Sequence, residues 1–351
     1  MQSLRSVLRP RQLAGLSRHP GTGPRVEAFC AKNGLDLSSV TVPVTTTDTK
    51  SFPDAILHFI TPKTLPEEES TRTVLYFHGG GYHNPLLANG HLPFALDITA
   101  ASRASSLVIL EYAFTPEHPF PCQLVQAIAA LRYLLDEKKI ASRDIVLAGD
   151  SAGGHLVLSL LAHVVEPSPY APAIDIPAPF CAAVLVSPWL SMTGEEPSVQ
   201  TNERDDFLSK SRLLQFVDFL GADNMNDVYA NPWQADTAQA VWDKAFPEKP
   251  LIARGQAGNI CRKVIVTVGT SEILLDSCVD FARKYVKCES LMIDKEDSLN
   301  IITPGGGYTE IKDFFLAVVT GEVHVQPGLD NGLGYKGGLM ARAVLQWLQT
   351  V

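Results

Sequence analysis

The sequence predicts an α/β fold in which a mostly parallel central sheet is flanked by helices, and three observations support this prediction. From about residue 40, short β-branched runs alternate with longer segments of helical periodicity. The runs are apolar at successive positions, as expected of strands that are covered on both faces. A glycine-rich turn joins one of these runs, residues 144–148, directly to an apolar helical segment.

The clearest strand-like runs follow one another at the spacing of strand and helix units. Between the runs at 107–111 and 144–148, apolar residues recur at helical spacing: Leu124, Ile128, Leu131 and Leu135. Residues 122–137 are therefore predicted to form an amphipathic crossover helix. The predicted strands are Thr73 to Phe77, Leu107 to Glu111, Asp144 to Ala148, Ala182 to Ser187 and Lys263 to Val268.

Length and composition predict one large domain, residues 1–351, whose core needs neither disulfides nor metal for stability. Hydrophobic residues make up 46% of the 351 residues and charged residues 19%, which is ordinary for a globular chain with a sizeable core. The formal net charge of −9 argues against nucleic acid or an anionic membrane surface as a partner. Small molecules are the expected partners, and a homodimer is left open.

Two regions break the alternation of strand and helix. Residues 1–40 precede the predicted sheet, and residues 190–255 form an excursion too long for a plain crossover. Both are predicted to be elements of a helical lid over the sheet. A third excursion, residues 294–318, contains a glycine-rich segment, Pro304 to Tyr308, that is interpreted as a loop.

Cysteine usage and the absence of long apolar stretches predict a cytoplasmic protein. The six cysteines form no C-x-x-C pair and lie mostly in apolar runs, which favours buried thiols in a reducing compartment. No stretch approaches the ~18 apolar residues of a membrane span. Residues 1–25 contain five arginines and no acidic residue, so a mitochondrial presequence is the alternative.

The strongest chemical motif is G-x-S-x-G at Gly149 to Gly153, between a predicted strand and an apolar helix. This context is the one that a nucleophile elbow requires, because the sharp turn projects the hydroxyl of Ser151 above the sheet. Small residues at Gly149, Gly153 and Gly154 let strand and helix approach each other. A dinucleotide-binding turn is disfavoured, because G-x-G-x-x-G is absent.

A second motif, His78-Gly79-Gly80-Gly81-Tyr82, directly follows the strand predicted at Thr73 to Phe77. Backbone N–H groups of such a glycine run can hold the negative oxygen of a tetrahedral intermediate, together with the N–H of Ala152. Gly80 and Gly81 are the favoured donors of this oxyanion hole, and Gly79 is expected to shape the loop.

With these motifs the chain resembles the hormone-sensitive-lipase-like group of α/β-hydrolases, esterases marked by an HGGG loop and a GDSAGG elbow. The stretch from Glu111 to Pro121 and the segment Ser187 to Leu190 are also similar to that group. The resemblance runs from about residue 72 to 350 and implies the α/β-hydrolase fold with a serine hydrolase activity. Within the group, the overall character is most similar to esterases of fungal secondary metabolism.

The resemblance also implies where the acid of a catalytic triad lies. The group's acid follows a strand, and the segment Val268 to Asp276 matches with Glu272 at the acid position, where aspartate is commoner. Asp276 is the rival acid and could instead pair on the following helix. Asp150, beside the nucleophile, is expected to anchor the elbow.

The general base should follow the acid in the chain, in the order serine, acid, histidine. His324 satisfies this order, because it is the only one of the nine histidines that lies downstream of Glu272. His324 would take the proton of Ser151 as the hydroxyl attacks an acyl carbonyl, and Glu272 would orient His324. This chemistry implies no cofactor and no metal, and H-E-x-x-H is absent.

These residues predict a serine carboxylesterase that acts on acyl esters of a small hydrophobic molecule. Two alternatives stay open: release of an acyl chain from a thioester or lactone, and a non-catalytic small-molecule receptor on the same fold, like the plant gibberellin receptors. The latter have lost the triad histidine, whereas His324 is present here. Five aromatic residues could line the pocket or form the core of the lid: Trp189, Phe207, Phe216, Phe219 and Trp233.

Overall fold

The computed structural model describes residues 21–63, 70–222, 225–247, 258–299 and 313–351. Most of the arginine-rich N-terminal segment, the glycine-rich segment at 304–308 and residues 248–255 of the predicted lid therefore lie outside the described residues. Within the described residues, no helix combines the length and the apolar character needed to cross a bilayer.

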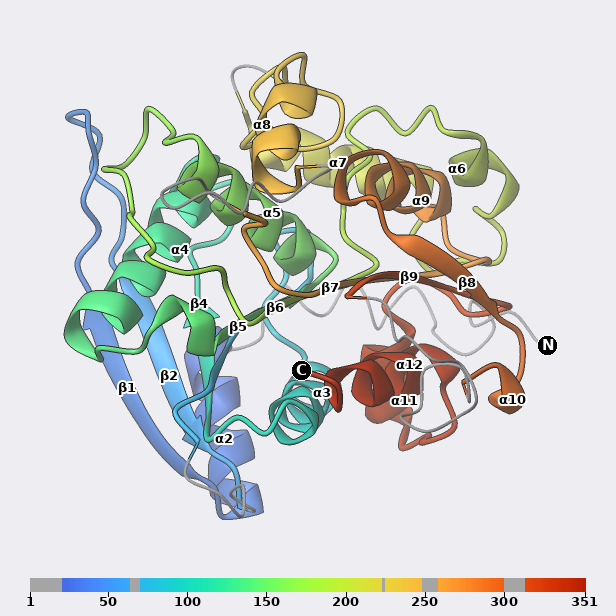
Figure 1. Cartoon of the computed structure of the whole chain (residues 1–351), viewed down its shortest axis with the longest axis horizontal. Helices are drawn as coiled ribbons and strands as arrows, with labels where there is room; N and C mark the ends of the chain where they lie inside the picture. The colour runs from blue at the N-terminus through green and yellow to red at the C-terminus, as the bar shows by residue number, and fades with distance from the viewer. Residues whose placement is uncertain (1–20, 64–69, 223–224, 248–257, 300–312) are drawn as a thin grey trace.

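A central nine-stranded sheet organises the described part of the chain, in the order β1-β2-β4-β3-β5-β6-β7-β9-β8 (Figure 1). β1 and β2 pair antiparallel, β2 joins β4 antiparallel, and every other pairing is parallel. The prediction of a mostly parallel sheet is thus confirmed. The strands are β1 Asp36–Val42, β2 Ala55–Thr61, β3 Thr73–Phe77, β4 Ser106–Glu111, β5 Ile145–Asp150, β6 Ala182–Val186, β7 Val264–Gly269, β8 Glu289–Ile293 and β9 Phe314–Val319.

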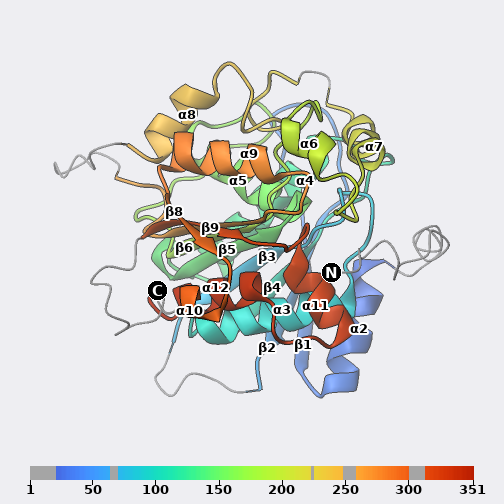
Figure 2. The same ribbon diagram turned by 90° about the vertical axis from the view of Figure 1, so that its right-hand side faces the viewer.

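Helices cover both faces of the sheet (Figures 1 and 2). On one face lie α2 Thr22–Asn33, α3 Ala88–Ala101, α10 Glu296–Leu299, α11 Gln326–Leu333 and α12 Leu339–Leu348. On the other lie α4 Cys122–Arg132, α5 Ala152–Val165, α6 Pro197–Thr201, α7 Lys210–Leu220, α8 Ala238–Ala245 and α9 Leu275–Phe281. The predicted helix at 122–137 is α4, continued by a π-helical turn, Tyr133–Glu137.

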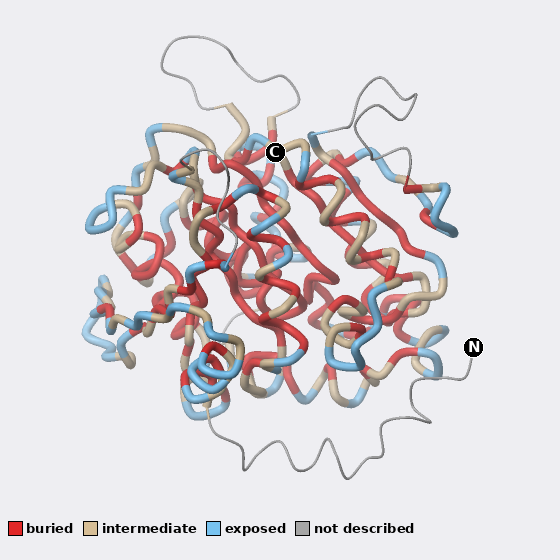
Figure 3. The backbone as a smooth tube through the Cα atoms, turned by 90° about the horizontal axis from the view of Figure 1, so that it is seen from below, coloured by how far each residue is buried: buried red, intermediate tan, exposed pale blue. Residues whose placement is uncertain are grey.

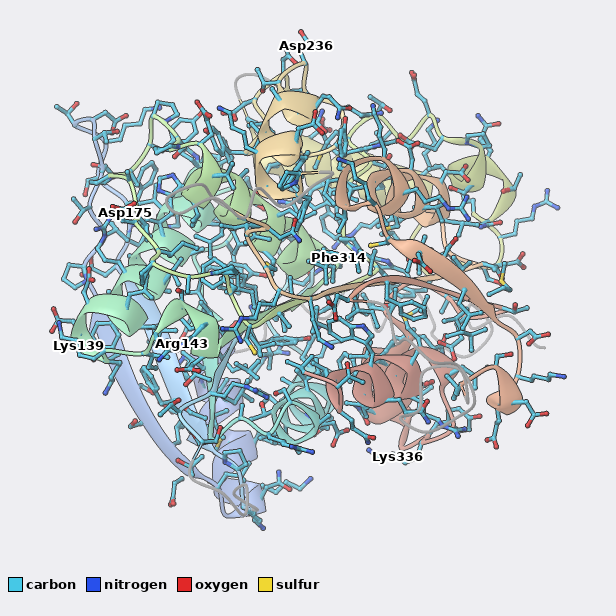
Figure 4. The ribbon with its side chains drawn as sticks, in the orientation of Figure 1. Lys139, Arg143, Asp175, Asp236, Phe314 and Lys336 are labelled. Carbon is cyan, nitrogen blue, oxygen red and sulfur yellow. The ribbon has the colours of Figure 1, made fainter. Side chains whose placement is uncertain are left out.

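The two faces of the sheet carry two hydrophobic clusters, which explains why the strands read as continuous apolar runs. Side chains of β3 alternate between the clusters: Leu75 and Phe77 pack toward α4 and α5, whereas Val74 and Tyr76 pack toward α3 and α12. Figure 3 shows the resulting buried interior beneath an exposed rim. Charged side chains such as Lys139, Asp236 and Lys336 project from the outside of the molecule (Figure 4).

The segments at 1–40 and 190–255 occupy different places around the sheet. Residues 36–40 belong to the edge strand β1, and α2 packs against α3, β1 and β2. Residues 190–247 form α6, α7 and α8, on the same face as α5 and α9 (Figure 2). Of the two, only the second segment reaches the cavity described below, as far as the described residues go.

Candidate active site

Ser151 stands on the sharp turn between β5 and α5, in a backbone conformation that few side chains adopt. Its φ of 52° and ψ of −118° lie outside the favoured regions for a residue with a Cβ atom. The turn is held from both sides: the N–H of Ser151 donates to the carbonyl of Val186 at 2.9 Å, and its own carbonyl accepts from the N–H of Trp189 at 2.9 Å. Such strain at a serine is typical of functional sites.

The glycines around Ser151 are required by close backbone contacts. A Cβ on Gly149 would lie 2.4 Å from the carbonyl carbon of Gly153, and a Cβ on Gly153 would lie 1.9 Å from the carbonyl oxygen of Phe77. A Cβ on Gly154 would lie 3.0 Å from Pro188. The helix therefore approaches the sheet at a distance that only glycine permits.

The predicted nucleophile, base and acid lie within hydrogen-bonding distance of one another, with the base in the middle. Nε2 of His324 is 2.9 Å from Oγ of Ser151, and Nδ1 of His324 is 3.0 Å from Oε2 of Glu272. The three residues come from turns after β5, β9 and β7, which all end at the same edge of the parallel sheet. All three are buried.

Glu272 is fixed by further donors behind the histidine. Its other carboxylate oxygen, Oε1, accepts from the hydroxyl of Ser187 at 2.9 Å and from the N–H of Gly269. The rival acid Asp276 points elsewhere, since its carboxylate accepts from the N–H of Ser198 at 2.7 Å at the start of α6. Glu272, rather than Asp276, contacts the imidazole.

The environment of His324 shifts its pKa upward. Burial lowers the pKa of His324, but the hydrogen bond and the negative charge of Glu272, with smaller contributions from Asp206 and Asp150, raise it above the ordinary value of 6.5. A positive charge on this imidazole is therefore stabilised by the adjacent carboxylates.

Asp206 is a third buried carboxylate at this site, and sequence reasoning did not single it out. It accepts from the N–H of Ile273 at 2.8 Å, of His324 at 3.4 Å and of Leu208 at 3.3 Å. Burial raises the pKa of Asp206 to about 6. Asp206 thus ties the 190–255 segment to both turns that carry Glu272 and His324. A lone aspartate in a polar stretch has no motif that could have predicted this position.

The glycine loop after β3 lies beside Ser151. Among the described residues, no acceptor bonds the N–H of Gly80 or Gly81, and the N–H of Ala152 is at the first position of α5, where helices have no internal acceptor. The N–H of Gly79, in contrast, donates to Asp150 at 3.1 Å. The four residues predicted for the oxyanion hole therefore divide into three unengaged donors and one that is engaged.

Asp150 ties the glycine loop to the elbow through three donors. Its carboxylate accepts from the hydroxyl of Tyr76 at 2.6 Å and from Nε2 of His91 at 3.2 Å, in addition to the N–H of Gly79. Burial opposes this charge, but His91 and Tyr76 outweigh it, so the pKa of Asp150 is lowered. Behind the loop, Oγ1 of Thr22 lies 3.2 Å from Nε2 of His78.

A cavity of about 880 Å³ opens in front of Ser151 and His324. It lies in the size range of small-molecule sites. Its walls come from the glycine loop, the start of α3, residues 207–216 and the start of α11. Among the aromatic candidates, Phe207 and Phe216 line it; Trp189, Phe219 and Trp233 do not, as they pack against Tyr82, His83 and Asp280 respectively.

The described residues contain no group of three or more histidine, cysteine, aspartate or glutamate side chains arranged to hold a metal ion. The six cysteines are buried. A mostly parallel sheet of this order, with a serine on the turn after β5 and a histidine after β9, defines the class of α/β hydrolases.

Comparison with known proteins agrees with this class. Residues 74–292 match the sequence model of the family described as alpha/beta hydrolase fold. An acetyl-hydrolase of Streptomyces hygroscopicus is 34% identical over 174 residues, which cover 49% of this chain and 54% of that protein. The human arylacetamide deacetylase-like 2 is 29% identical over 50% of this chain and 43% of its own length. The chain thus spans about half the length of these curated relatives.

Solved structures give the same fold over nearly the whole chain. An esterase from the bacterial hormone-sensitive lipase family superposes with a TM-score of 0.62 at 23% identity, covering 97% of this chain and 94% of that one. An esterase/lipase from an uncultured bacterium gives a TM-score of 0.63 at 20% identity, with 99% and 94% covered. The chain therefore belongs to the family described as alpha/beta hydrolase fold. The link to fungal secondary metabolism stays a prediction.

Proposed function

We propose that the chain is a serine carboxylesterase that hydrolyses acyl esters of a small molecule through Ser151, His324 and Glu272. The observation that carries this proposal is the 2.9 Å contact between Nε2 of His324 and Oγ of Ser151 at the wall of the cavity. A base within hydrogen-bonding distance of a hydroxyl is the arrangement that activates a serine nucleophile.

In the proposed mechanism, His324 accepts the hydroxyl proton as Oγ of Ser151 attacks the ester carbonyl. The resulting imidazolium is stabilised by Glu272, which lies 3.0 Å away on the other side of the ring. His324 then gives the proton to the leaving alcohol. Water, activated by the same imidazole, hydrolyses the acyl-enzyme and regenerates Ser151.

The negative oxygen of the tetrahedral intermediate would be held by the N–H groups of Gly80, Gly81 and Ala152. Each lacks an acceptor in the described residues, so each is available to a substrate. Gly79 is assigned a supporting role, because its N–H is already engaged by Asp150. This division keeps the loop in shape while leaving its tip open.

Residues 190–255 are proposed to cover the cavity as a lid, because residues 207–216 form one of its walls. For residues 1–40, the proposal is modified. Their described part lies away from the cavity, and Thr22 contacts His78 at the base of the glycine loop. This segment is therefore assigned a role in supporting the loop.

The test is hydrolysis of p-nitrophenyl butyrate together with labelling by a fluorophosphonate probe. Ser151→Ala should abolish both. Ser159→Ala is the matched control, because Ser159 is a second buried serine, within α5, whose hydroxyl donates to the backbone carbonyl of Tyr229. Full labelling of Ser151→Ala would refute the assignment. A panel of matched esters, lactones and acyl thioesters then identifies the preferred leaving group.

A further inference from the structure

Besides the reacting groups, a polar wall of the cavity in front of Ser151 is formed by the N-terminal part of α7. Ser209, Ser211, Arg212 and Gln215 line the cavity from this helix and its N-cap. Much of the remaining lining is apolar or glycine, including Leu87, Leu329 and Val325. A substrate that fits this cavity therefore meets an apolar surface over most of its length and a polar one at α7.

Arg212 is the fully charged group of that wall. Its guanidinium donates to Oε1 of Gln215 at 2.5 Å and lies 4.6 Å from the centroid of the Phe216 ring. Among the described residues, no carboxylate forms an ion pair with it. Burial lowers the pKa of Arg212, as expected of a cation that has lost part of its hydration.

The carboxylate of the cavity lining, Asp150, is not the partner of Arg212. Asp150 already accepts from Tyr76, Gly79 and His91. The N-terminal end of α7 adds its own positive partial charge to the same wall. The positive charge at this wall is thus left for a group that enters the cavity.

Phe216 connects Arg212 to the glycine loop beside Ser151. The Phe216 ring that contacts the guanidinium also contacts the glycine loop, since a Cβ on Gly81 would lie 2.5 Å from that ring. One aromatic side chain therefore borders both the proposed oxyanion donors and the cation. A substrate seated at Ser151 can reach Arg212 with a second functional group.

We propose that the ester substrate carries a carboxylate, which Arg212 binds at the α7 wall of the cavity. Guanidinium is planar and matches a carboxylate with two parallel hydrogen bonds. This inference rests on the ester hydrolysis proposed above and specifies the substrate class: a hemiester of a diacid, or an ester of a hydroxy acid.

The test uses two pairs of esters that differ in one negative charge. In the first pair the charge is on the acyl side: mono-4-nitrophenyl adipate against 4-nitrophenyl hexanoate. In the second pair it is on the leaving group: 4-butyryloxybenzoate against its methyl ester. The wild-type protein should show a higher kcat/KM for the charged member of at least one pair. Arg212→Met should lower that charged-to-neutral ratio by about ten-fold or more.

Lys210→Met is the matched control. Lys210 is a cation on the same helical turn, but it does not line the cavity, so this variant should keep the wild-type ratio. An equal loss of preference in both variants would mean that a diffuse positive field, rather than binding by Arg212, sets the preference. An unchanged ratio in Arg212→Met with both pairs would also overturn the proposal.

A binding measurement separates this proposal from the proposed activity. Calorimetric titration of Ser151→Ala with the charged and the neutral ester of each pair needs no turnover. Tighter binding of the carboxylate, lost in Ser151→Ala/Arg212→Met, supports the assignment even if the wild-type protein hydrolyses none of these esters. Equal binding of the charged and the neutral ester in both pairs by Ser151→Ala, together with hydrolysis of neutral esters by the wild type, would refute the Arg212 inference alone.

Discussion

Oε2 of Glu272 lies 3.0 Å from Nδ1 of His324, and both side chains are buried, Glu272 completely. The carboxylate thus acts on an imidazole that water hardly reaches. In such surroundings its charge raises the affinity of the ring for a proton more than it would at a surface. The pH dependence of activity is therefore the direct measure of this contact.

Glu272→Gln should shift the acidic limb of the kcat/KM profile to lower pH. In the wild type, His324 is a base only when neutral, so activity falls as the pH drops through its raised pKa, with a midpoint above 6.5. Without the carboxylate that midpoint decreases, and the rate falls by up to about 10⁴-fold. Glu272→Asp keeps the charge and should retain more of the upward shift. A midpoint that is the same in Glu272→Gln and the wild type would contradict this role.

Asp206→Ala should lower both stability and kcat. The substitution leaves the buried N–H groups of Ile273, His324 and Leu208 without an acceptor, at a cost of about 1–3 kcal/mol for each group that water cannot reach. Chemical denaturation measures the first effect and steady-state kinetics the second. Asp205→Ala, at the exposed neighbouring position, is the control and should alter neither.

The stability difference between wild type and Asp206→Ala should also depend on pH. The pKa of Asp206 in the folded protein is about 6, above the ordinary value of 3.8. The folded state therefore binds this proton more tightly, so the contribution of Asp206 to stability is full below pH 3.8 and decreases as the pH rises through 6. Denaturation at pH 4 and pH 7 should show the larger difference at pH 4, and the opposite order would exclude this explanation.

Gly153→Ala should prevent α5 from approaching the sheet. Its Cβ would lie 1.9 Å from the carbonyl oxygen of Phe77, a backbone atom that cannot move aside cheaply. We expect a loss of about 3 kcal/mol or more in the free energy of unfolding. Gly332→Ala, in α11 with nothing within 4 Å of the new Cβ, should instead be neutral or stabilise by about 0.5–1 kcal/mol. Equal thermal stability of the two variants would rule out the contact as the cause.

Phe216→Ala should change the preferred acyl length. The ring lines the cavity and touches the glycine loop, so its removal enlarges the space near Ser151 and should favour longer chains in a series of p-nitrophenyl esters. Phe219→Ala is the control, since Phe219 packs on His83 and does not line the cavity. The same optimum in both variants would show that Phe216 does not limit the chain.

The sequence predicted the parts of the fold that depend on local pattern. The five proposed strands lie within two residues of β3 to β7, because fully buried strands are continuous apolar runs. β1 was missed and partly assigned to the lid, since an edge strand with mostly exposed residues lacks such a run. β9 was missed as well, because most of its residues were assigned to the end of the excursion at 294–318.

The same reasoning applies to the site. Ser151 and the glycine loop lie in motifs, Glu272 follows from the resemblance and His324 from chain order, so these residues were named from the sequence. Asp206 and Arg212 were not, because their significance comes from segments that meet only in the folded chain. Trp189, Phe219 and Trp233 could not be separated from Phe207 and Phe216 by composition, since all are aromatic residues in the same stretch.

His324 lies 173 positions after Ser151 in the chain, and this order has a consequence during synthesis of the protein. The strained serine turn is translated before β6, β7 and β9, and the proposed base follows the last of these. A nascent chain therefore carries the hydroxyl of Ser151 before its proposed base, His324, has been synthesised. Under the proposed mechanism, esterase activity would appear late, and its onset would report completion of the sheet rather than formation of the elbow.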